Sequence, residues 1–160
     1  MNLEQFGKYV EEVYRPTASL ISLAPAKKLD WKPGEKFWVL GQLLNHLSTS
    51  TWSVAYVING SWFKEGGMED DEENLGPLDP KAARARLDQG LEAAKKAVAA
   101  LAERDYQSKI VSAPWDPKLK MPLWRLLLFM VEHMATHKTQ LYMYLKLLGQ
   151  PVNTQTLYMG

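Results

Sequence analysis

The sequence predicts an all-α fold, a four-helix bundle with a long acidic loop between the second and third helices. Apolar residues recur at spacings of three and four in four long stretches, which is the pattern of amphipathic helices. No stretch shows a convincing alternation of apolar and polar residues, the pattern of a strand. Helices of this kind bury their apolar faces against one another. Because 160 residues are enough for one hydrophobic core, we expect a single domain over residues 1–160.

The first predicted helix covers residues 3–24. Pro16 lacks a backbone N–H, so we expect a kink or break just before it, and Pro25 ends the helix. The residues predicted to face the core are Leu3, Phe6, Val10, Val13, Tyr14, Leu20 and Ile21.

The second predicted helix covers about residues 35–59. Its middle, residues 48–53, consists mainly of small polar side chains with low helix propensity, which we interpret as tight packing between helices. The following residues 64–77 contain the acidic run 69–73, whose spacing is not that of a calcium loop, so we expect a solvated loop. The core-facing residues predicted for the second helix are Phe37, Leu40, Leu44, Leu47, Val54 and Ile58.

The third predicted helix begins at Asp79-Pro80, with Asp as the N-cap and Pro at the first helical position, and runs to about Arg104. Residues 105–121 are predicted to be irregular, with a short extended piece at Ile110-Val111. The fourth predicted helix opens at Pro122, runs to about Leu148 and stops at Gly149.

Composition excludes several classes of function. The net charge of +1, with basic residues scattered among acidic ones, gives no field that would attract nucleic acid or an anionic membrane. The absence of cysteine excludes disulfides, thiolate ligands and a cysteine nucleophile. The longest apolar run, residues 126–131, is too short to cross a bilayer, and the N-terminus does not read as a signal peptide. We therefore expect a cytoplasmic protein.

The chain has three histidines, and their placement suggests a site. His133 and His137 are four residues apart in the fourth predicted helix, so both imidazoles lie on one helical face, which we predict to face the core. His46 lies in the second predicted helix. Imidazoles from two facing helices can hold a divalent metal ion. A buried histidine is more often a hydrogen-bonded core residue, so the spacing alone leaves both interpretations open.

Several segments resemble the DinB/YfiT-like family of metal-binding four-helix bundles. Residues 31–34 (Trp-Lys-Pro-Gly) and 43–47 (Leu-Leu-Asn-His-Leu) are similar to the segment that leads to the family's first metal histidine. A C-terminal signature of two histidines four apart, followed by a glutamine and an apolar closing segment, is matched here as well. The resemblance spans nearly the whole chain and implies three metal ligands: His46, His133 and His137.

The chain departs from the family pattern at two places. Family members often have a glutamate directly after the first histidine of the pair and Arg-Gly before the glutamine, whereas Met134 and Lys138-Thr139 stand here. Without that glutamate, residues 133–137 also lack the general base of a zinc metalloprotease motif. By helical position, the residues that can support the three imidazoles are Gln42, Ser50, Thr136 and Gln140.

The resemblance also implies a homodimer, a nickel, zinc or iron-type ion, and in some relatives S-transferase or isomerase chemistry with a low-molecular-weight thiol. Three neutral imidazoles leave the ion an open position, where it can bind water, a thiol or a carbonyl of a small-molecule substrate. Because only neutral imidazole binds metal, we expect the ion to stabilise the fold above a pH of about 6.5 and less below it.

Three functions stay open at this point. The first is a metal-dependent enzyme, either a thiol-dependent S-transferase or a hydrolase of a small substrate; the sequence does not identify its catalytic residues. The second is a non-catalytic metal-containing binding or structural module. The third is a metal-free pocket for a small molecule, lined by Trp52, Tyr56, Trp124 and Tyr142.

Overall fold

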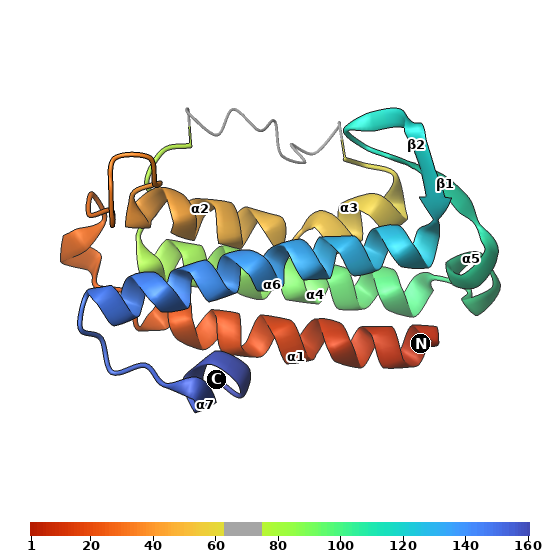
Figure 1. Ribbon diagram of the computed structural model, residues 1–160. Coiled ribbons are helices and arrows are strands. Elements are labelled where there is room, and N and C mark those ends of the chain that lie inside the picture. Colours follow the sequence, from red (N-terminus) through yellow and green to blue (C-terminus); the bar gives the residue numbers. More distant parts are fainter. Residues whose placement is uncertain (63–74) are drawn as a thin grey trace.

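The long helices of the protein lie side by side in a computed structural model that describes residues 1–62 and 75–160 (Figure 1). Each of them packs against at least two of the others. No helix in the described part of the chain is both long enough and apolar enough to cross a membrane. The long elements are α1 (Leu3–Ser22), α2 (Leu40–Ser50) with its continuation α3 (Ser53–Asn59), α4 (Pro80–Ala100) and α6 (Leu123–Leu147).

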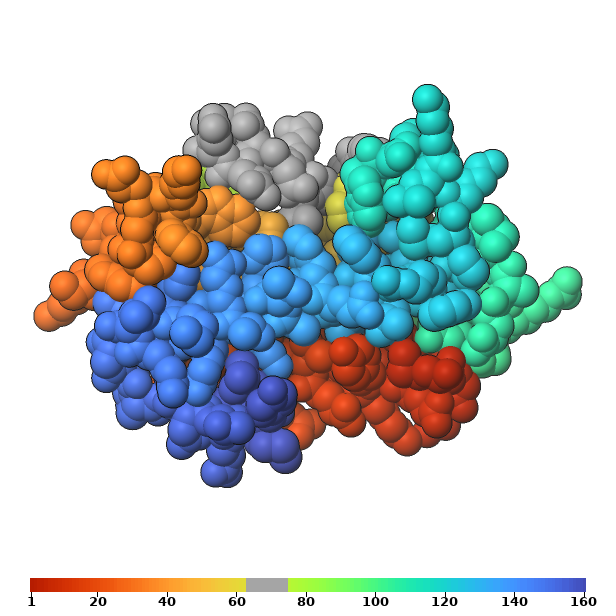
Figure 2. Space-filling model, in the orientation of Figure 1, coloured from red at the N-terminus to blue at the C-terminus, as the bar shows by residue number. Residues whose placement is uncertain are grey.

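Shorter elements complete the fold at the ends of the long helices. A 3₁₀ turn, η1 (Ala26–Lys28), follows α1, and α7 (Thr154–Tyr158) lies against α1 and α6 near the C-terminus. Helix α5 (Glu103–Ser108) leads into an antiparallel hairpin of β1 (Ile110–Ala113) and β2 (Asp116–Pro122). In the space-filling view, α6 crosses the front of the molecule between the loop of residues 31–39 and this hairpin (Figure 2).

The hydrophobic core is contributed by the facing sides of the long helices, as the helical spacing of apolar residues predicts. Of the residues predicted to face it, most are buried, although Phe37 is 53% exposed. The largest fully buried side chains are Tyr14, Tyr106, Tyr144, Phe6, Leu20, Ile21, Leu40, Leu43, Leu44, Leu47, Leu87 and Leu126.

The first helix has the predicted extent to within two residues, but it does not break at Pro16. Proline in a helix interior costs about 3 kcal/mol, because it removes a hydrogen bond and crowds the preceding turn. Pro16 is itself buried, and the helical turns on both sides of it contribute Tyr14 and Leu20 to the same core. Burial on both sides of the proline therefore keeps the helix continuous.

The second predicted helix is wrong at its start and in its middle. The structure has a loop up to Val39, and the helix is interrupted at Thr51 and Trp52. The interruption coincides with hydroxyl groups that bond to backbone carbonyls: Thr51 Oγ1 donates to Ser48 O at 2.7 Å, and Ser53 Oγ donates to Ser50 O at 2.7 Å. Such local bonds compete with the helical pattern and weaken a helix interior.

The segment after the third predicted helix is more ordered than expected. Asp79 caps α4 as predicted, accepting hydrogen bonds from two backbone N–H groups at 2.9 and 3.0 Å. The helix ends at Ala100 rather than near Arg104, and the extended piece at Ile110-Val111 belongs to a hairpin, so the fold is not purely α. The acidic run 69–73 lies outside the described residues.

Helix α4 comes very close to the junction of α2 and α3 at Gly90. A Cβ atom added there would lie 2.1 Å from Thr51 Oγ1, 2.9 Å from Thr51 Cβ and 3.0 Å from the Trp52 ring. The Thr51 backbone carbonyl in turn accepts a hydrogen bond from the buried Tyr14 hydroxyl. This junction follows directly after the helix that carries His46, so its packing helps to place that histidine.

We therefore expect Gly90→Ala to destabilise the protein, although alanine is the better helix former. Overpacking costs about 1–3 kcal/mol and the gain in propensity is about 1 kcal/mol, so the free energy of unfolding should fall by up to about 2 kcal/mol. Urea unfolding measures this. Gly7→Ala is the matched control on α1, because its Cβ would meet only Val98 Cγ1 at 3.5 Å, and it should be neutral or stabilising. Equal stabilities of the two variants would contradict the close packing at Gly90.

Candidate metal centre

The structure brings all three histidines to one place between α2 and α6. His46 lies on α2, and His133 and His137 lie one turn apart in the middle of α6. One ring nitrogen from each imidazole lies within 4.8 Å of the others. His46 Nε2 and His133 Nε2 are 3.0 Å apart, and the ring of His137 lies 4.3 Å from that of His46 and 4.6 Å from that of His133, centroid to centroid.

This arrangement fits a divalent metal ion. Imidazole nitrogens bind zinc at about 2.0–2.1 Å, so two of them on one tetrahedral ion lie about 3.3 Å apart. The 3.0 Å separation of the two Nε2 atoms is close to that value. Within the described part of the chain, no carboxylate belongs to the cluster. The donor set is therefore three imidazoles, which suits zinc, nickel or iron better than magnesium or calcium.

The pair on α6 lies at the edge of the core rather than inside it. His46 is only 2% exposed, but His133 and His137 are half-buried, and Phe129, one turn before His133, is 39% exposed. The residues of α6 in the core are the neighbours of the pair, including Met130 and Met134. His133 and His137 lie at the border of the apolar face of α6, with core residues on one side of them and solvent on the other. The site is therefore enclosed at His46 and accessible from the α6 side.

Burial keeps the imidazoles of His46 and His133 uncharged. Loss of solvation, together with repulsion from the charged forms of His137 and His133, lowers the pKa of His46 to about 3. Burial, together with the charge of His137, lowers the pKa of His133 to about 4. These two side chains therefore offer lone pairs to a metal ion well below pH 6.5. The expected fading of metal binding with falling pH moves to a lower pH window than ordinary imidazoles predict.

Trp38 covers one side of the cluster. Its ring lies 4.8 Å from that of His46 and 5.6 Å from that of His137, and it is nearly parallel to the latter, with an angle of 18°. Sequence reasoning missed this residue, because it assigned residues 35–39 to a helix. Nothing in the spacing of a single tryptophan in a loop would have revealed its contact with the histidines.

Of the four predicted supporting residues, Gln140 meets an imidazole nitrogen: its Oε1 lies 2.9 Å from His137 Nδ1. Gln42 instead caps α2, accepting a hydrogen bond from Val39 N at 3.0 Å. The Ser50 hydroxyl donates to the backbone carbonyl of His46 at 2.7 Å, and Thr136 donates to the backbone carbonyl of Glu132. Helical position alone did not distinguish these cases.

Aromatic residues from three elements gather at the hairpin end of α6. The rings of Trp62 and Trp115 are 6.3 Å apart, and those of Trp115 and Phe129 are 5.3 Å apart. Phe129 is four residues before His133, so it lies on the same side of α6, one turn away. Half of the Trp115 side chain is exposed. An apolar surface therefore continues along α6 from the imidazoles towards the hairpin.

In the described part of the chain, the residues predicted to line a metal-free pocket make different contacts. Trp52 stacks on Tyr56, with ring centroids 5.9 Å apart, and its indole N–H donates to the backbone carbonyl of Arg86 on α4 at 3.3 Å. Tyr142 lies next to Lys146, whose Nζ is 5.4 Å from the ring. A cavity of about 340 Å³ beside α3 includes Tyr56 and none of the other three.

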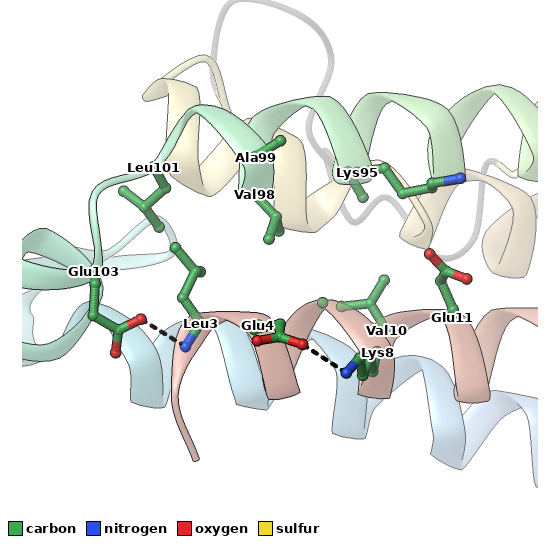
Figure 3. Close-up of a pocket in the computed structure, with 12 residues that line it drawn as sticks. Leu3, Glu4, Lys8, Val10, Glu11, Lys95, Val98, Ala99, Leu101 and Glu103 are labelled. Carbon is green, nitrogen blue, oxygen red and sulfur yellow. Dashed lines mark hydrogen bonds and ion pairs between the residues drawn. The ribbon is translucent and has the colours of Figure 1, made fainter.

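A groove of about 470 Å³ lies away from the histidines, between α1 and α4 (Figure 3). Aliphatic side chains such as Val10 and Val98 line it. At its rim, Glu4 pairs with Lys8 at 2.6 Å, and Glu103 accepts a hydrogen bond from the backbone N–H of Leu3 at 2.9 Å (Figure 3). These rim groups satisfy one another and form no ligand or nucleophile cluster. The imidazole cluster, rather than this groove, is the candidate for chemistry.

We expect the metal-free protein to lose stability as the pH falls from about 6.5 towards 4. The unfolded chain has ordinary imidazoles with a pKa of about 6.5, whereas His46 and His133 in the fold have values of about 3 and 4. Between these values the unfolded state binds more protons, so the free energy of unfolding decreases as the pH falls, by up to about 1.4 kcal/mol for each pH unit and each group. Urea unfolding in the presence of a chelator measures it.

The control for this measurement is the double variant His46→Leu with His133→Leu, which keeps the carboxylates that also titrate at low pH. Its stability should depend less steeply on pH between 6.5 and 4. The same slope in both proteins would show that the imidazoles are not held uncharged in the fold.

Comparison with known proteins identifies the fold and the family of this chain. The structure superposes on the crystal structure of a DinB-like protein, YjoA of Bacillus subtilis, with a TM-score of 0.71 and 18% sequence identity over 92% of this chain and 94% of that chain. At this identity the likeness concerns the fold. No curated protein matches the sequence significantly. The sequence model of the DinB superfamily matches residues 9–141, which include all three histidines, and the chain therefore belongs to the DinB superfamily.

Proposed function

We propose that this protein binds one divalent metal ion through His46, His133 and His137 and uses it to act on a small molecule, by thiol-dependent S-transfer or by hydrolysis. The observation that carries the proposal is the meeting of three imidazole nitrogens within 4.8 Å, from two helices far apart in the sequence. In this proposal the fold acts as a four-helix bundle, whose facing helices supply the ligands from its interior. The nickel, zinc or iron-type ion that the family resemblance implies suits this donor set.

A catalytic site is favoured over a closed structural one by the number and exposure of the ligands. Structural zinc sites have four protein ligands, whereas three leave a position for water or substrate. His133 and His137 are half-buried, so that position is within reach of solvent. The core is extensive without the ion, with residues of every long helix buried, so the fold does not depend on metal in the way a zinc finger does.

The residues of the chain divide the work around such an ion. When bound, the ion supplies a Lewis acid that lowers the pKa of a coordinated water or thiol. The three imidazoles hold it without neutralising its charge. The Trp38 ring covers His46 and His137 and keeps water from that side. Trp115 and Phe129 provide apolar surface one turn beyond His133, where the carbon skeleton of a substrate can pack.

The alternative is a metal-containing binding or structural module without turnover. One observation favours it: within the described residues, no carboxylate joins the cluster to serve as a general acid or base. A bound metal ion would lower the pKa of a thiol or water without help from such a group, so the absence does not decide between the two functions. The expected homodimer stays a prediction, because the structure describes a single chain.

We expect His46→Ala, His133→Ala and His137→Ala each to abolish stoichiometric metal binding, because two imidazoles hold an ion far more weakly than three. Elemental analysis of the purified proteins after dialysis against zinc measures the occupancy. Thr139→Ala is the control, because this exposed residue lies on the same helix and its hydroxyl donates to the backbone carbonyl of Ala135. If all three histidine variants retained one ion per chain, the ligand assignment would be wrong.

The same samples report on stability. An ion that binds only the folded chain stabilises it by about 3–4 kcal/mol at free concentrations of roughly 100–1,000 times Kd. We expect a chelator to lower the melting temperature of the wild type and of Thr139→Ala, and to leave the histidine variants unchanged. Complete unfolding of the wild type by chelator would mean that the metal has a structural role.

A thiol titration separates S-transfer from the other functions. We expect cobalt-substituted protein to develop a charge-transfer band in the near ultraviolet when small thiols are added, because a thiolate would occupy the open position. Incubation of the thiol-bound protein with a panel of electrophiles then tests for turnover. The absence of any spectral change with thiols would exclude the S-transfer version. Activity on esters or amides without thiol would support hydrolysis, and no turnover in either assay would favour the non-catalytic module.

A further inference from the structure

We propose that Gln140 is a positioning residue that holds His137 in the tautomer needed for metal binding. A neutral imidazole carries one proton, on either Nδ1 or Nε2, and only the other nitrogen has a lone pair for a metal ion. Which nitrogen carries the proton is set by the partner of that nitrogen. In this structure the partner of His137 Nδ1 is Gln140 Oε1, at 2.9 Å.

A second hydrogen bond fixes the orientation of the Gln140 amide. Its Nε2 lies 3.4 Å from the hydroxyl oxygen of Tyr144, one turn further along α6. That hydroxyl lies 3.0 Å from the backbone carbonyl of Trp38, which can only accept a hydrogen bond. The single proton of the Tyr144 hydroxyl is therefore donated to Trp38. The hydroxyl oxygen can then only accept from Gln140, so the amide nitrogen of Gln140 faces Tyr144 and its oxygen faces His137.

The proton positions follow along this chain of contacts. Tyr144 donates to Trp38, Gln140 donates to Tyr144, and the oxygen of Gln140 has to accept from His137 Nδ1. His137 is therefore protonated at Nδ1, and its Nε2 is left with a lone pair. The opposite amide orientation would place the Gln140 oxygen against the Tyr144 oxygen with no proton between them. This series of hydrogen bonds thus selects the tautomer of His137 before any ion binds.

The last side chain in this series of hydrogen bonds, Tyr144, is held firmly in the fold. Tyr144 is 2% exposed, and the Trp31 ring packs edge-on against it, with centroids 5.6 Å apart at an angle of 82°. The backbone carbonyl of Trp38 accepts the hydrogen bond from Tyr144, and the ring of the same residue lies over His137. The loop of residues 31–39 is therefore bound to α6 by its backbone and covers the ligand with its side chain. A change at Gln140 should act on the tautomer of His137 and not on the fold.

The inference rests on the proposed metal site, but its first test does not need metal. Long-range ¹H–¹⁵N correlation spectra of metal-free protein with labelled histidine show which ring nitrogen of His137 carries the proton. With three histidines in the chain, the His46→Ala and His133→Ala variants assign the signals. We expect His137 to be protonated at Nδ1 in the wild type. In Gln140→Leu we expect a mixture of tautomers or the Nε2–H form. Nε2–H in the wild type would overturn the proposal.

Metal affinity is the second readout, measured with zinc in competition with a chromophoric chelator. Loss of a hydrogen-bond partner of a metal-bound histidine weakens metal binding by about 10–100-fold. We expect this loss for Gln140→Leu and a smaller one for Tyr144→Phe, which frees the amide to rotate. Gln140→Glu should rescue the affinity, because a carboxylate oxygen still accepts from Nδ1. Thr136→Ala is the control on the solvent side of the same turn and should bind as the wild type does.

The two readouts separate this proposal from the proposed function. Zinc affinity that is equal in Gln140→Leu and the wild type would overturn the positioning role while leaving the metal site intact. A wild type that binds neither zinc, nickel nor ferrous iron would overturn the proposed function, and the tautomer spectra would still decide the role of Gln140. Circular dichroism shows whether a variant is folded, and Gln140→Glu supplies a second variant at the same position if Gln140→Leu is not.

Discussion

The packing of α2 against α6 is the constraint on which the site depends, because it forces three imidazoles into one poorly solvated space. Histidine buried in this way loses the stabilisation of its charged form by water, which is why the pKa values of His46 and His133 are low. The fold therefore places one polar side chain, His46, almost fully inside an apolar interface, with His133 and His137 at its border. Replacing such buried polar groups by apolar ones of similar size is often neutral or stabilising. An ion bound by the imidazole lone pairs would offset this cost.

Contacts at the start of α2 hold His46 in place against this cost. The backbone N–H of Gly41 donates to Leu29 O at 2.8 Å, and the carbonyl of Gly41 accepts from the N–H of Leu78 at 2.9 Å, so chain segments on both sides bind the first turn of the helix. Next to His46, the Asn45 side chain bonds to Gly76 O at 2.8 Å and to Arg86 of α4 at 2.6 Å. The most buried of the three histidines thus lies on a helix whose position is fixed by hydrogen bonds to its neighbours.

The sequence could predict the parts of the fold and site that depend on periodicity. The spacing of apolar residues predicted the long helices, and the spacing of His133 and His137 placed two imidazoles on one face. The Asp79-Pro80 pair and Gly149 predicted the start of α4 and the end of α6. Prediction from sequence failed where local interactions of similar strength compete to determine the secondary structure. The hydroxyl-to-carbonyl bonds that interrupt the helix after Ser50 and the exposed hairpin beside α5 have no periodic signal. Trp38 and the choice of Gln140 among four polar candidates depend on tertiary contact alone.

Two uncharged imidazoles and an oriented amide would prepare the proposed metal site before an ion arrives. Below a pH of about 6.5, ordinary histidines are largely protonated and an ion has to displace those protons, whereas the pKa values of His46 and His133 are low, and in our proposal Gln140 also selects the tautomer of His137. Such preorganisation shifts the free energy of ordering from the binding step to folding. The large core supplied by the four long helical segments can bear that shift, which a smaller metal-dependent domain could not. The size of the hydrophobic core is therefore what makes a preorganised site possible in this fold.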